Sequence, residues 1–396
     1  MSATTRRHST EFPSYRHLSD QARRLLVAGC LLQGVADAGA LAFFSRQPGV
    51  PARFRGASAE QWRAAFGEAA GAGLVSPMGR GRYGLHPALP AYLDARWRRE
   101  EPGDHDAARS AAITCLIAAY ATLGGRIVNR VKEGDAGRAV GVVGIQRQNF
   151  GCFLGLALAA REWDLAHDIA QALNQYWNAR GLLEEARDWV ERVRQATEGP
   201  GGTPPGLDTP AGALWLFAVS SQASRQLQAH RLEEAEATER ELLAMLNGQP
   251  PSTHRQRQIA RAYHNLGVLF QARGRLDDAE AWYCRSLEVR EELMGRSDMA
   301  ETYRDLGMAA RGRGRPDDAG AWQRRSLEIQ EGRRNCPGMA MTGAALRALR
   351  EERQRLSEAV DPLATRPAGT LGHDPASLVG PQQPSTRSPR SWQPVT

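Results

Sequence analysis

Residue patterns that carry hydrolytic or metal chemistry do not occur in this 396-residue sequence. It contains no His-Glu-x-x-His metal site and no Gly-x-Ser-x-Gly nucleophile turn, and its five cysteines form no Cys-x-x-Cys pair. A phosphate-binding loop needs Gly-x-x-x-x-Gly-Lys-Ser/Thr, but the single lysine, Lys132, lies in Val-Lys-Glu-Gly. We therefore expect no enzymatic activity, no metal and no cofactor.

A different chemistry, the recognition of carboxylates by guanidinium and amide groups, is available on two predicted helices. Residues three and four apart share one face of a helix, so side chains at this spacing can act on one ligand. The candidates for partner binding are Arg261, His264, Asn265 and Val268 in one segment and Arg304, Asp305 and Met308 in the next. Two arginines and an amide in this set could hold a peptide carboxylate or an acidic side chain.

The two segments belong to a repeat of 40 residues. Four matches share this offset: residues 261–270 with 301–310, 274–279 with 314–319, Trp282 with Trp322, and 286–288 with 326–328. Within each unit a Leu-Gly pair lets two antiparallel helices approach closely, and Gly274 or Gly314 marks the end of the first helix. These residues resemble the tetratricopeptide repeat, in a variant of about 40 residues rather than 34.

Weaker copies of the repeat lie upstream, at residues 230–235 and 181–186, and residues 161–166 begin another helix of this type. We expect one helical stack from about Gln146 to Arg334, followed by a helix that caps its end. In such a superhelix the first helices of the hairpins line a concave face, which is the usual partner-binding surface.

Between Tyr15 and Arg99 the pattern changes to three short helices and a β-hairpin. The helices are expected near residues 19–33, 35–46 and 58–71, the strands at 74–76 and 82–85, and a further helix from Pro87. Three helices followed by a hairpin form a winged-helix-like module.

The N-terminal module and the helical repeats after it are both similar to parts of one class of regulator. Gly73-Leu-Val75, Tyr83-Gly-Leu-His-Pro87 and Tyr92-Leu93 resemble the winged helix that follows the nucleotide-binding domain of STAND-class signalling ATPases. Residues 148–150, 176–181 and 185–189 resemble the helical repeats that follow it in actinobacterial regulators of this class. The resemblance covers about residues 15–335 and implies a role in a signalling or regulatory assembly. The resemblance does not imply ATPase activity for this chain, because the sequence lacks the phosphate-binding loop.

The resemblance also implies a role for His86, which matches a winged-helix histidine that contacts the diphosphate of ADP in that class. Pro87 stands where an aspartate often follows. A nucleotide-binding subunit supplied in trans could use His86 in this way. Without one, we interpret His86 as a structural residue between the wing and the next helix.

Nucleic acid is a further possible ligand of a winged helix, whose third helix can enter the major groove. Residues 1–100 are basic, with fourteen arginines and seven acidic residues. The helix predicted at 58–71, however, offers only Arg63 against Glu60 and Glu68. Two carboxylates beside one cation oppose contact with phosphate, so we do not expect nucleic acid as the partner.

Composition is that of a globular protein, with 42% hydrophobic and 24% charged residues. The longest weakly charged runs, Ser110–Gly125 and Gly151–Ala160, fall short of the roughly 20 apolar residues of a membrane helix. No apolar segment follows Arg6-Arg7 as in a secretory signal. We therefore expect a cytoplasmic protein with reduced thiols and no membrane partner.

The sequence thus predicts a mainly α protein in which a winged-helix-like module precedes an α-solenoid. The predicted division is 1–14 disordered, 15–100 winged-helix-like module, 101–198 degenerate helical repeats, 199–212 loop, 213–335 tetratricopeptide repeats, 336–360 capping helix and 361–396 disordered Pro-rich tail. The preferred function is a non-catalytic adaptor for a protein or peptide partner. The alternatives are a DNA-binding transcriptional regulator and the effector half of a split STAND ATPase.

Overall fold

The computed structural model describes residues 12–293, 296–332 and 336–364. The segments predicted to be disordered, 1–14 and 361–396, lie almost entirely outside this range. Two of their edges are described: a 3-10 helix, η1, begins at Pro13, and the last helix, α15, ends at Ala364.

The N-terminal module combines short helices with a small sheet. Its elements in chain order are η1 Pro13–His17, α1 Asp20–Leu26, η2 Val27–Leu31, β1 Val35–Asp37, α2 Ala38–Phe44, α3 Ala59–Gly71, β2 Val75–Gly79, β3 Arg82–Leu85 and α4 Leu89–Glu100. The strands are antiparallel in the order β1-β3-β2, with Ala36 opposite Tyr83 and Ser76 opposite Gly84. The three helices and the hairpin are those that the sequence predicts, and β1 is an addition.

The predicted helix at 35–46 is wrong in its first three residues, which form β1. Asp37 is extended (φ −121°, ψ 117°), and its carboxylate accepts hydrogen bonds from the backbone N–H groups of Gly39 and Ala40 at 2.8 and 3.0 Å. This N-cap starts α2 at Ala38 and frees the preceding residues to pair with β3. The helix predicted at 19–33 is also shorter, because it changes to the 3-10 helix η2 after Leu26.

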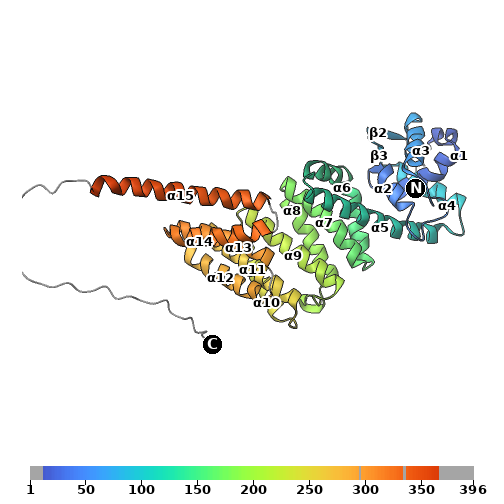
Figure 1. The fold of residues 1–396 in the computed structure, drawn as a ribbon. Helices are drawn as coiled ribbons and strands as arrows, with labels where there is room; N and C mark the ends of the chain where they lie inside the picture. Colours follow the sequence, from blue (N-terminus) through green and yellow to red (C-terminus); the bar gives the residue numbers. More distant parts are fainter. Residues whose placement is uncertain (1–11, 294–295, 333–335, 365–396) are drawn as a thin grey trace, which may run out of the picture.

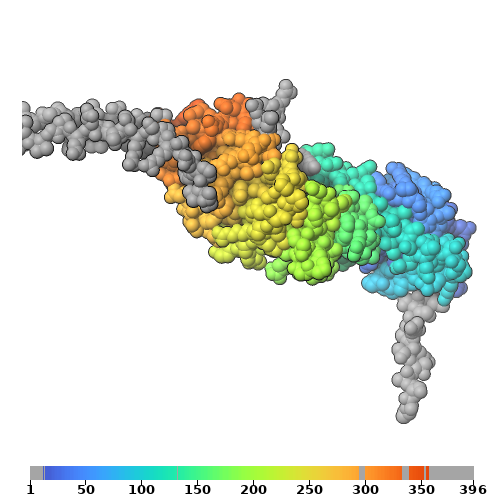
Figure 2. Space-filling model, turned by 90° about the horizontal axis from the view of Figure 1, so that it is seen from below, coloured from blue at the N-terminus to red at the C-terminus, as the bar shows by residue number. Residues whose placement is uncertain are grey.

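The remainder of the chain is a stack of helices that runs away from the module in sequence order (Figures 1 and 2). The helices are α5 His105–Lys132, α6 Ala136–Ala159, α7 Trp163–Arg180, α8 Leu183–Thr197, η3 Pro200–Gly202, α9 Pro210–Gln228, α10 Leu232–Asn247, α11 Thr253–Ala272, α12 Leu276–Glu292, α13 Arg296–Gly312, α14 Pro316–Gly332 and α15 Cys336–Ala364. Antiparallel hairpins form between α6 and α7, α9 and α10, α11 and α12, and α13 and α14. The mainly α architecture with a solenoid is therefore confirmed.

Matching contacts stabilise the two clearest hairpins. The Ser286 hydroxyl donates to the carbonyl oxygen of Ala260 at 2.7 Å, and 40 residues later Ser326 donates to Ala300 at 2.6 Å. In each hairpin the first helix is followed by a glycine with positive φ, Gly274 after α11 and Gly314 after α13. His230 takes this conformation in a weaker copy (φ 56°), at a cost that glycine avoids. Such departures explain why the upstream copies are harder to see in the sequence.

The last helix, α15, packs on α14 through its first half and extends beyond it (Figure 1). The Thr342 hydroxyl donates to Gln330 Oε1 at 3.1 Å, and Leu349 is buried. The sequence predicts a capping helix here, and the first half of α15 lies where such a helix would act.

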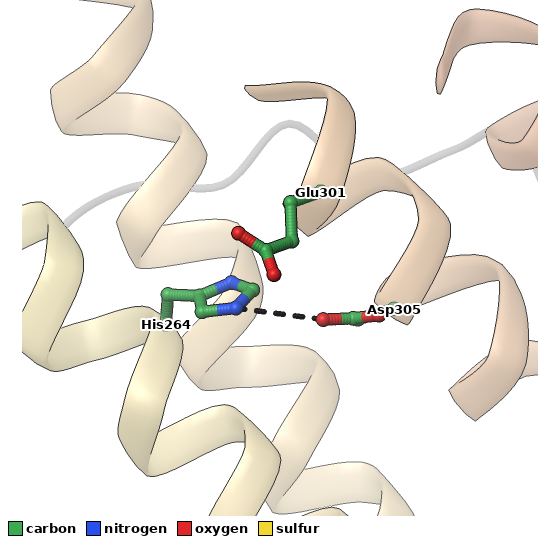
Figure 3. Close-up of side chains that lie close together, drawn as sticks. All are labelled: His264, Glu301 and Asp305. Atoms are coloured by element: carbon green, nitrogen blue, oxygen red, sulfur yellow. Dashed lines mark ion pairs between the residues drawn. The ribbon is translucent and has the colours of Figure 1, made fainter. Parts of the chain in front are cut away.

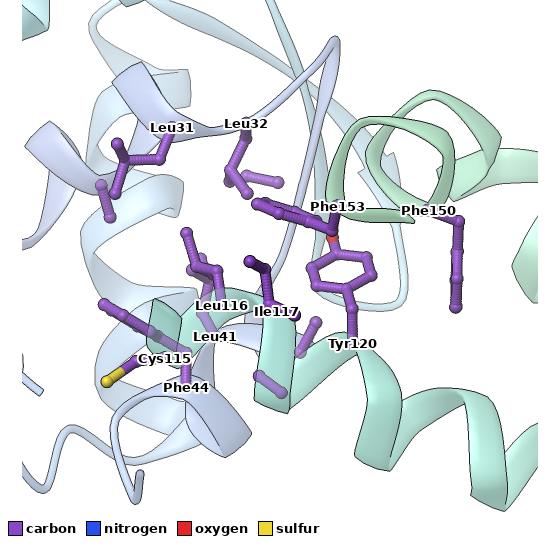
Figure 4. Packing of buried hydrophobic residues seen from close by; sticks show 14 of the residues in the cluster. Leu31, Leu32, Leu41, Phe44, Cys115, Leu116, Ile117, Tyr120, Phe150 and Phe153 are labelled. Carbon is purple, nitrogen blue, oxygen red and sulfur yellow. The ribbon is translucent and has the colours of Figure 1, made fainter. Parts of the chain in front are cut away.

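One continuous hydrophobic core joins the module to the beginning of the stack. In Figure 4, Leu32 and Phe44 of the module lie beside Leu116 and Tyr120 of α5 and Phe153 of α6. The helix α5 is long and apolar enough to cross a membrane, but 56% of its most apolar window is buried. It packs against α2, α6 and α7, as a core helix does.

Two buried amides add polar links at this junction. Asn149 accepts from the Gln33 N–H at 2.6 Å and donates to the Val35 carbonyl oxygen at 2.7 Å. Gln146 accepts from the Tyr120 hydroxyl at 2.7 Å and donates to Asp37 at 3.3 Å. The backbone of α6 departs from helical geometry at Gln146, which is also where the sequence places the start of the stack.

Candidate partner-binding face

The seven predicted binding residues lie on α11 and α13, the first helices of two successive hairpins. Their exposure separates them into two groups. Arg261 and Met308 are exposed, and His264 and Asp305 are buried. The other three, Asn265, Val268 and Arg304, are half-buried. The predicted face therefore consists of exposed side chains above a buried polar layer.

In the buried layer, His264 of α11 meets residues of α13 (Figure 3). Its Nε2 atom lies 3.4 Å from Asp305 Oδ2, and its Nδ1 atom shares a 3.1 Å hydrogen bond with the Thr302 hydroxyl. Thr302 in turn accepts from Arg290 Nη1 at 2.5 Å, so its own proton is available to His264 Nδ1. We accordingly assign the imidazole proton to Nε2, facing Asp305.

The pKa values in this layer follow from burial and from the surrounding arginines. Burial lowers the pKa of His264 to about 3, with further lowering by Arg290, Arg304 and Arg261. Burial raises the pKa of Asp305 to about 6, although Arg304 opposes this. The imidazole is therefore neutral at physiological pH, and its contact with Asp305 is a polar contact rather than an ion pair.

Three side chains of this layer could in principle hold a metal ion. Donor atoms of His264, Glu301 and Asp305 lie within 4.8 Å of one another. The Arg304 guanidinium, however, is 3.0 Å from Asp305 Oδ1 and 3.6 Å from Glu301 Oε1. A cation already neutralises both carboxylates, so the cluster suits an ion-pair network better than a divalent ion.

Sequence reasoning missed one member of the layer, Glu239 of α10. Its Oε1 atom accepts from Asn265 Nδ2 at 2.7 Å, while its Oε2 atom is buried without a hydrogen-bond partner among the described residues. Burial raises the pKa of Glu239 to about 7. No sequence signal marks this residue, because its burial depends on how α10 packs against α11.

Replacing Glu239 with glutamine is expected to stabilise the protein at high pH. The folded-state pKa of about 7 exceeds the ordinary value of 4.5, so the folded state binds the proton more tightly. The protonated Glu239 carboxyl therefore contributes stability that increases as pH falls from about 7 towards 4.5 and is lost as pH rises through about 7. We expect Glu239→Gln to raise the free energy of unfolding by about 2 kcal/mol at pH 8 and to change it little at pH 4.5. Urea denaturation at the two pH values measures this difference.

The matched control for this prediction is Glu233→Gln on the same helix, because the Glu233 side chain is 89% exposed. An equal effect of the two variants, or a Glu239→Gln effect that does not depend on pH, would contradict the assigned burial cost.

Above the buried layer, the exposed side chains combine unpaired cations with apolar groups. Arg257 and Arg261 are exposed one turn apart on α11, and neither forms an ion pair with a described residue. Met308 is 43% exposed on α13, and Val268 is half-buried. This combination can attract an acidic group and cover an apolar one.

His86 lies far from this face in sequence, between β3 and α4. Its Nδ1 atom accepts from the Ala88 N–H at 3.2 Å, and its ring packs edge-on against Phe12 with centroids 6.2 Å apart. These contacts fit the structural role at the wing–helix junction. The nucleotide-contacting role stays a prediction.

The surface of α3 offers little free positive charge. Arg63 pairs with Glu60 at 3.2 Å, and Glu68 accepts a 2.7 Å hydrogen bond from the Ser19 hydroxyl. Arg82 of β3 donates to the Gly79 carbonyl oxygen at 3.4 Å. No observation here favours DNA binding over the alternative functions.

Comparison with known proteins identifies the repeats that build the candidate face. Residues 258–332, which contain α12, α13, α14 and most of α11, match the tetratricopeptide repeat family. No curated protein matches the chain significantly.

Among solved structures, BtubC (BKLC) from P. vanneervenii is 16% identical, and the match covers 69% of this chain and 99% of that chain with a TM-score of 0.33. MamA is also 16% identical, covering 52% of this chain and 95% of that chain with a TM-score of 0.30. A STAND protein with a tetratricopeptide repeat sensor from Pyrococcus horikoshii is 12% identical, with a TM-score of 0.39. That match covers 88% of this chain, which spans only 58% of the STAND chain.

Proposed function

We propose that this chain, which carries tetratricopeptide repeats at residues 258–332, is a non-catalytic adaptor that binds a peptide or protein segment on the α11–α13 face. Tetratricopeptide repeats generally mediate protein–protein interactions. The observation that carries the proposal is the pair of exposed arginines on α11, Arg257 and Arg261, neither of which forms an ion pair with a described residue; Met308 is exposed on α13.

The chemistry of the face defines the class of partner. A guanidinium group without an ion pair favours a carboxylate, with which it can form two parallel hydrogen bonds. The Met308 thioether and the Val268 side chain favour an apolar residue, and methionine adapts its shape to different ligands. We therefore propose an extended segment that carries an acidic side chain next to an apolar one.

The buried layer supports this role because it holds the two first helices in fixed register. Contacts of His264 with Thr302 and Asp305 join α11 to α13, and the hydrogen bond between Asn265 and Glu239 joins α11 to α10. A face that is already ordered loses less conformational entropy when a partner binds.

The cellular setting that we propose is a bacterial signalling or regulatory assembly in the cytoplasm. The STAND-like order of motifs supports it, and a nucleotide-binding subunit could act in trans. Cys30, Cys115, Cys152 and Cys284 are free thiols, and burial raises the pKa of each, most for Cys30 to about 12. Thiols of this kind react slowly.

A peptide selection tests the proposal. A random library displayed on phage is selected against the full chain, and enriched peptides are synthesised and measured by fluorescence anisotropy. We expect enriched sequences to place Asp or Glu beside an apolar residue, and Arg261→Glu to weaken their binding because it replaces an attractive charge with a repulsive one. Failure to enrich such sequences would contradict the proposal.

The control is Arg324→Glu, an identical charge change on α14, the second helix of its hairpin. Arg324 is exposed and forms no ion pair with a described residue. Equal binding to wild type and to both variants would place the ligand elsewhere on the molecule.

A further inference from the structure

We propose that a cavity between α7, α8 and α9 binds a carboxylate attached to a small apolar group, through the guanidinium of Arg225. This site is separate from the α11–α13 face and does not depend on the function proposed for that face.

Arg225 is a buried cation without an acidic partner. The residue is only 4% exposed, and no described carboxylate forms an ion pair with it. Its one hydrogen bond to a described residue runs from Nη1 to the amide oxygen of Asn174. A guanidinium carries five N–H donors, so most of its donor capacity is not used by the protein.

Two acidic groups beside this position are engaged by other arginines. Glu184 and Glu234 line a hollow beside Arg225. Glu184 lies 2.6 Å from Arg187 and 3.5 Å from Arg231, and Glu234 lies 3.7 Å from Arg231. Burial lowers the pKa of Arg225 to about 10, which still leaves it charged at neutral pH.

A cavity of about 270 Å³ opens onto Arg225. Trp177 and Leu183 supply apolar walls, and Asn178 and Gln228 supply neutral amides. Arg225 and Trp177 also line a second hollow, whose walls include the apolar residues Val190 and Phe217. The volume of the first cavity is slightly below the usual range for small-molecule sites, roughly 300–1,000 Å³, so it suits a small ligand.

The ligand class follows from these walls. An isolated buried cation is unfavourable unless a counter-charge reaches it. Among the described residues, the group that accepts a hydrogen bond from Arg225 is the neutral amide of Asn174. The planar guanidinium matches a carboxylate in a two-point geometry, and the amides can add donors. The Trp177 indole and Leu183 can cover a hydrocarbon group of a few atoms. A free small acid and the C-terminal carboxylate of a peptide share this chemistry.

Thermal denaturation of the full chain tests the site. Sodium benzoate, the peptide acetyl-Ala-Ala-Phe, sodium phosphate and sodium chloride are compared at equal ionic strength. We expect benzoate or the peptide to raise the Tm of the wild type by several degrees more than chloride does. The peptide with a C-terminal amide has no carboxylate and should have no such effect. A rise in Tm with the peptide but not with benzoate would identify the ligand as the C-terminal carboxylate of a peptide rather than a free small acid.

Two variants connect the shift to Arg225. Arg225→Gln is expected to abolish the carboxylate-dependent shift and to raise the Tm without ligand, because it removes an uncompensated buried charge. Arg240→Gln, on an exposed arginine of α10, should keep the full shift. Gln228→Leu leaves Arg225 in place and should weaken benzoate binding at least threefold by calorimetry, which keeps the test decisive if Arg225→Gln does not fold.

The proposal is overturned by any of three results. The carboxylate-dependent shift could persist in Arg225→Gln, which would assign it to other arginines. Phosphate could stabilise as strongly as benzoate, which would indicate a general anion effect. All carboxylates could behave like chloride, which would show that the cavity does not bind them.

Discussion

Replacing Asn149 with alanine is expected to destabilise the N-terminal sheet by about 3 kcal/mol. The Asn149 side chain is fully buried and satisfies two backbone groups of the module, the Gln33 N–H and the Val35 carbonyl oxygen. Alanine would leave both without a partner, and each orphaned group costs about 1–3 kcal/mol. Since Val35 begins β1, we expect the loss of stability to appear first in that strand.

Amide hydrogen exchange of the β1–β3 pair measures the loss locally. A change of about 3 kcal/mol corresponds to exchange roughly 100-fold faster at Ala38 and Leu85, whose N–H groups donate across the pair to the Gly81 and Gly34 carbonyl oxygens at 2.9 and 2.8 Å. The control is Arg138→Ala, because Arg138 is exposed on the same helix and forms no ion pair with a described residue. Unchanged exchange in Asn149→Ala would show that the module does not depend on α6 for its stability.

Replacing Gly267 with alanine is expected to lower the free energy of unfolding by about 2–3 kcal/mol. A Cβ atom at Gly267 would lie 2.5 Å from two ring carbons of Tyr283. That ring is fully buried, and its hydroxyl donates to Gln271 at 2.8 Å, so it cannot move aside easily. The overpacking outweighs the gain of about 1 kcal/mol in helix propensity.

The same repeat position in the next hairpin provides the comparison. A Cβ atom at Gly307 would meet the side chain of Gln323, with its Nε2 atom 2.6 Å away. Gln323 has more rotatable bonds than a tyrosine ring and can swing away, at the loss of its 3.0 Å hydrogen bond to the Arg304 carbonyl oxygen. We expect Gly307→Ala to cost about 1 kcal/mol. Equal effects in the two variants, measured by urea denaturation, would contradict this packing argument.

The hairpins of residues 261–332 could be predicted because their structure is local. Glycine at the end of the first helix and a small residue at the crossing recur at an offset of 40 residues, and each is read directly from the sequence. Upstream, His230 replaces the glycine and the signal weakens although the helices persist. The strand β1 was missed because three residues before an alanine-rich helix carry no periodicity of their own.

The position of the candidate face could be predicted from the sequence, but which of its residues are exposed and which are buried could not. Helical spacing places His264 and Arg261 on one side of α11. Which of them is buried depends on the angle between α11 and α13, and this angle brings His264 to Asp305. The Arg225 cavity left no sequence signal either, because an arginine without an acidic partner is recognised only once its neighbours in α7 and α8 are known.

The central claim is that the α11–α13 face binds a partner through Arg261, and the ratio of two dissociation constants tests it most directly. For peptides selected on the wild type, we expect Arg261→Glu to weaken binding at least tenfold, since a charge-assisted hydrogen bond contributes about 1.5–3 kcal/mol. Arg324→Glu, on the second helix of the next hairpin, should change binding less than about twofold. Equal affinities for wild type and Arg261→Glu, or equal weakening by the two variants, would contradict the account.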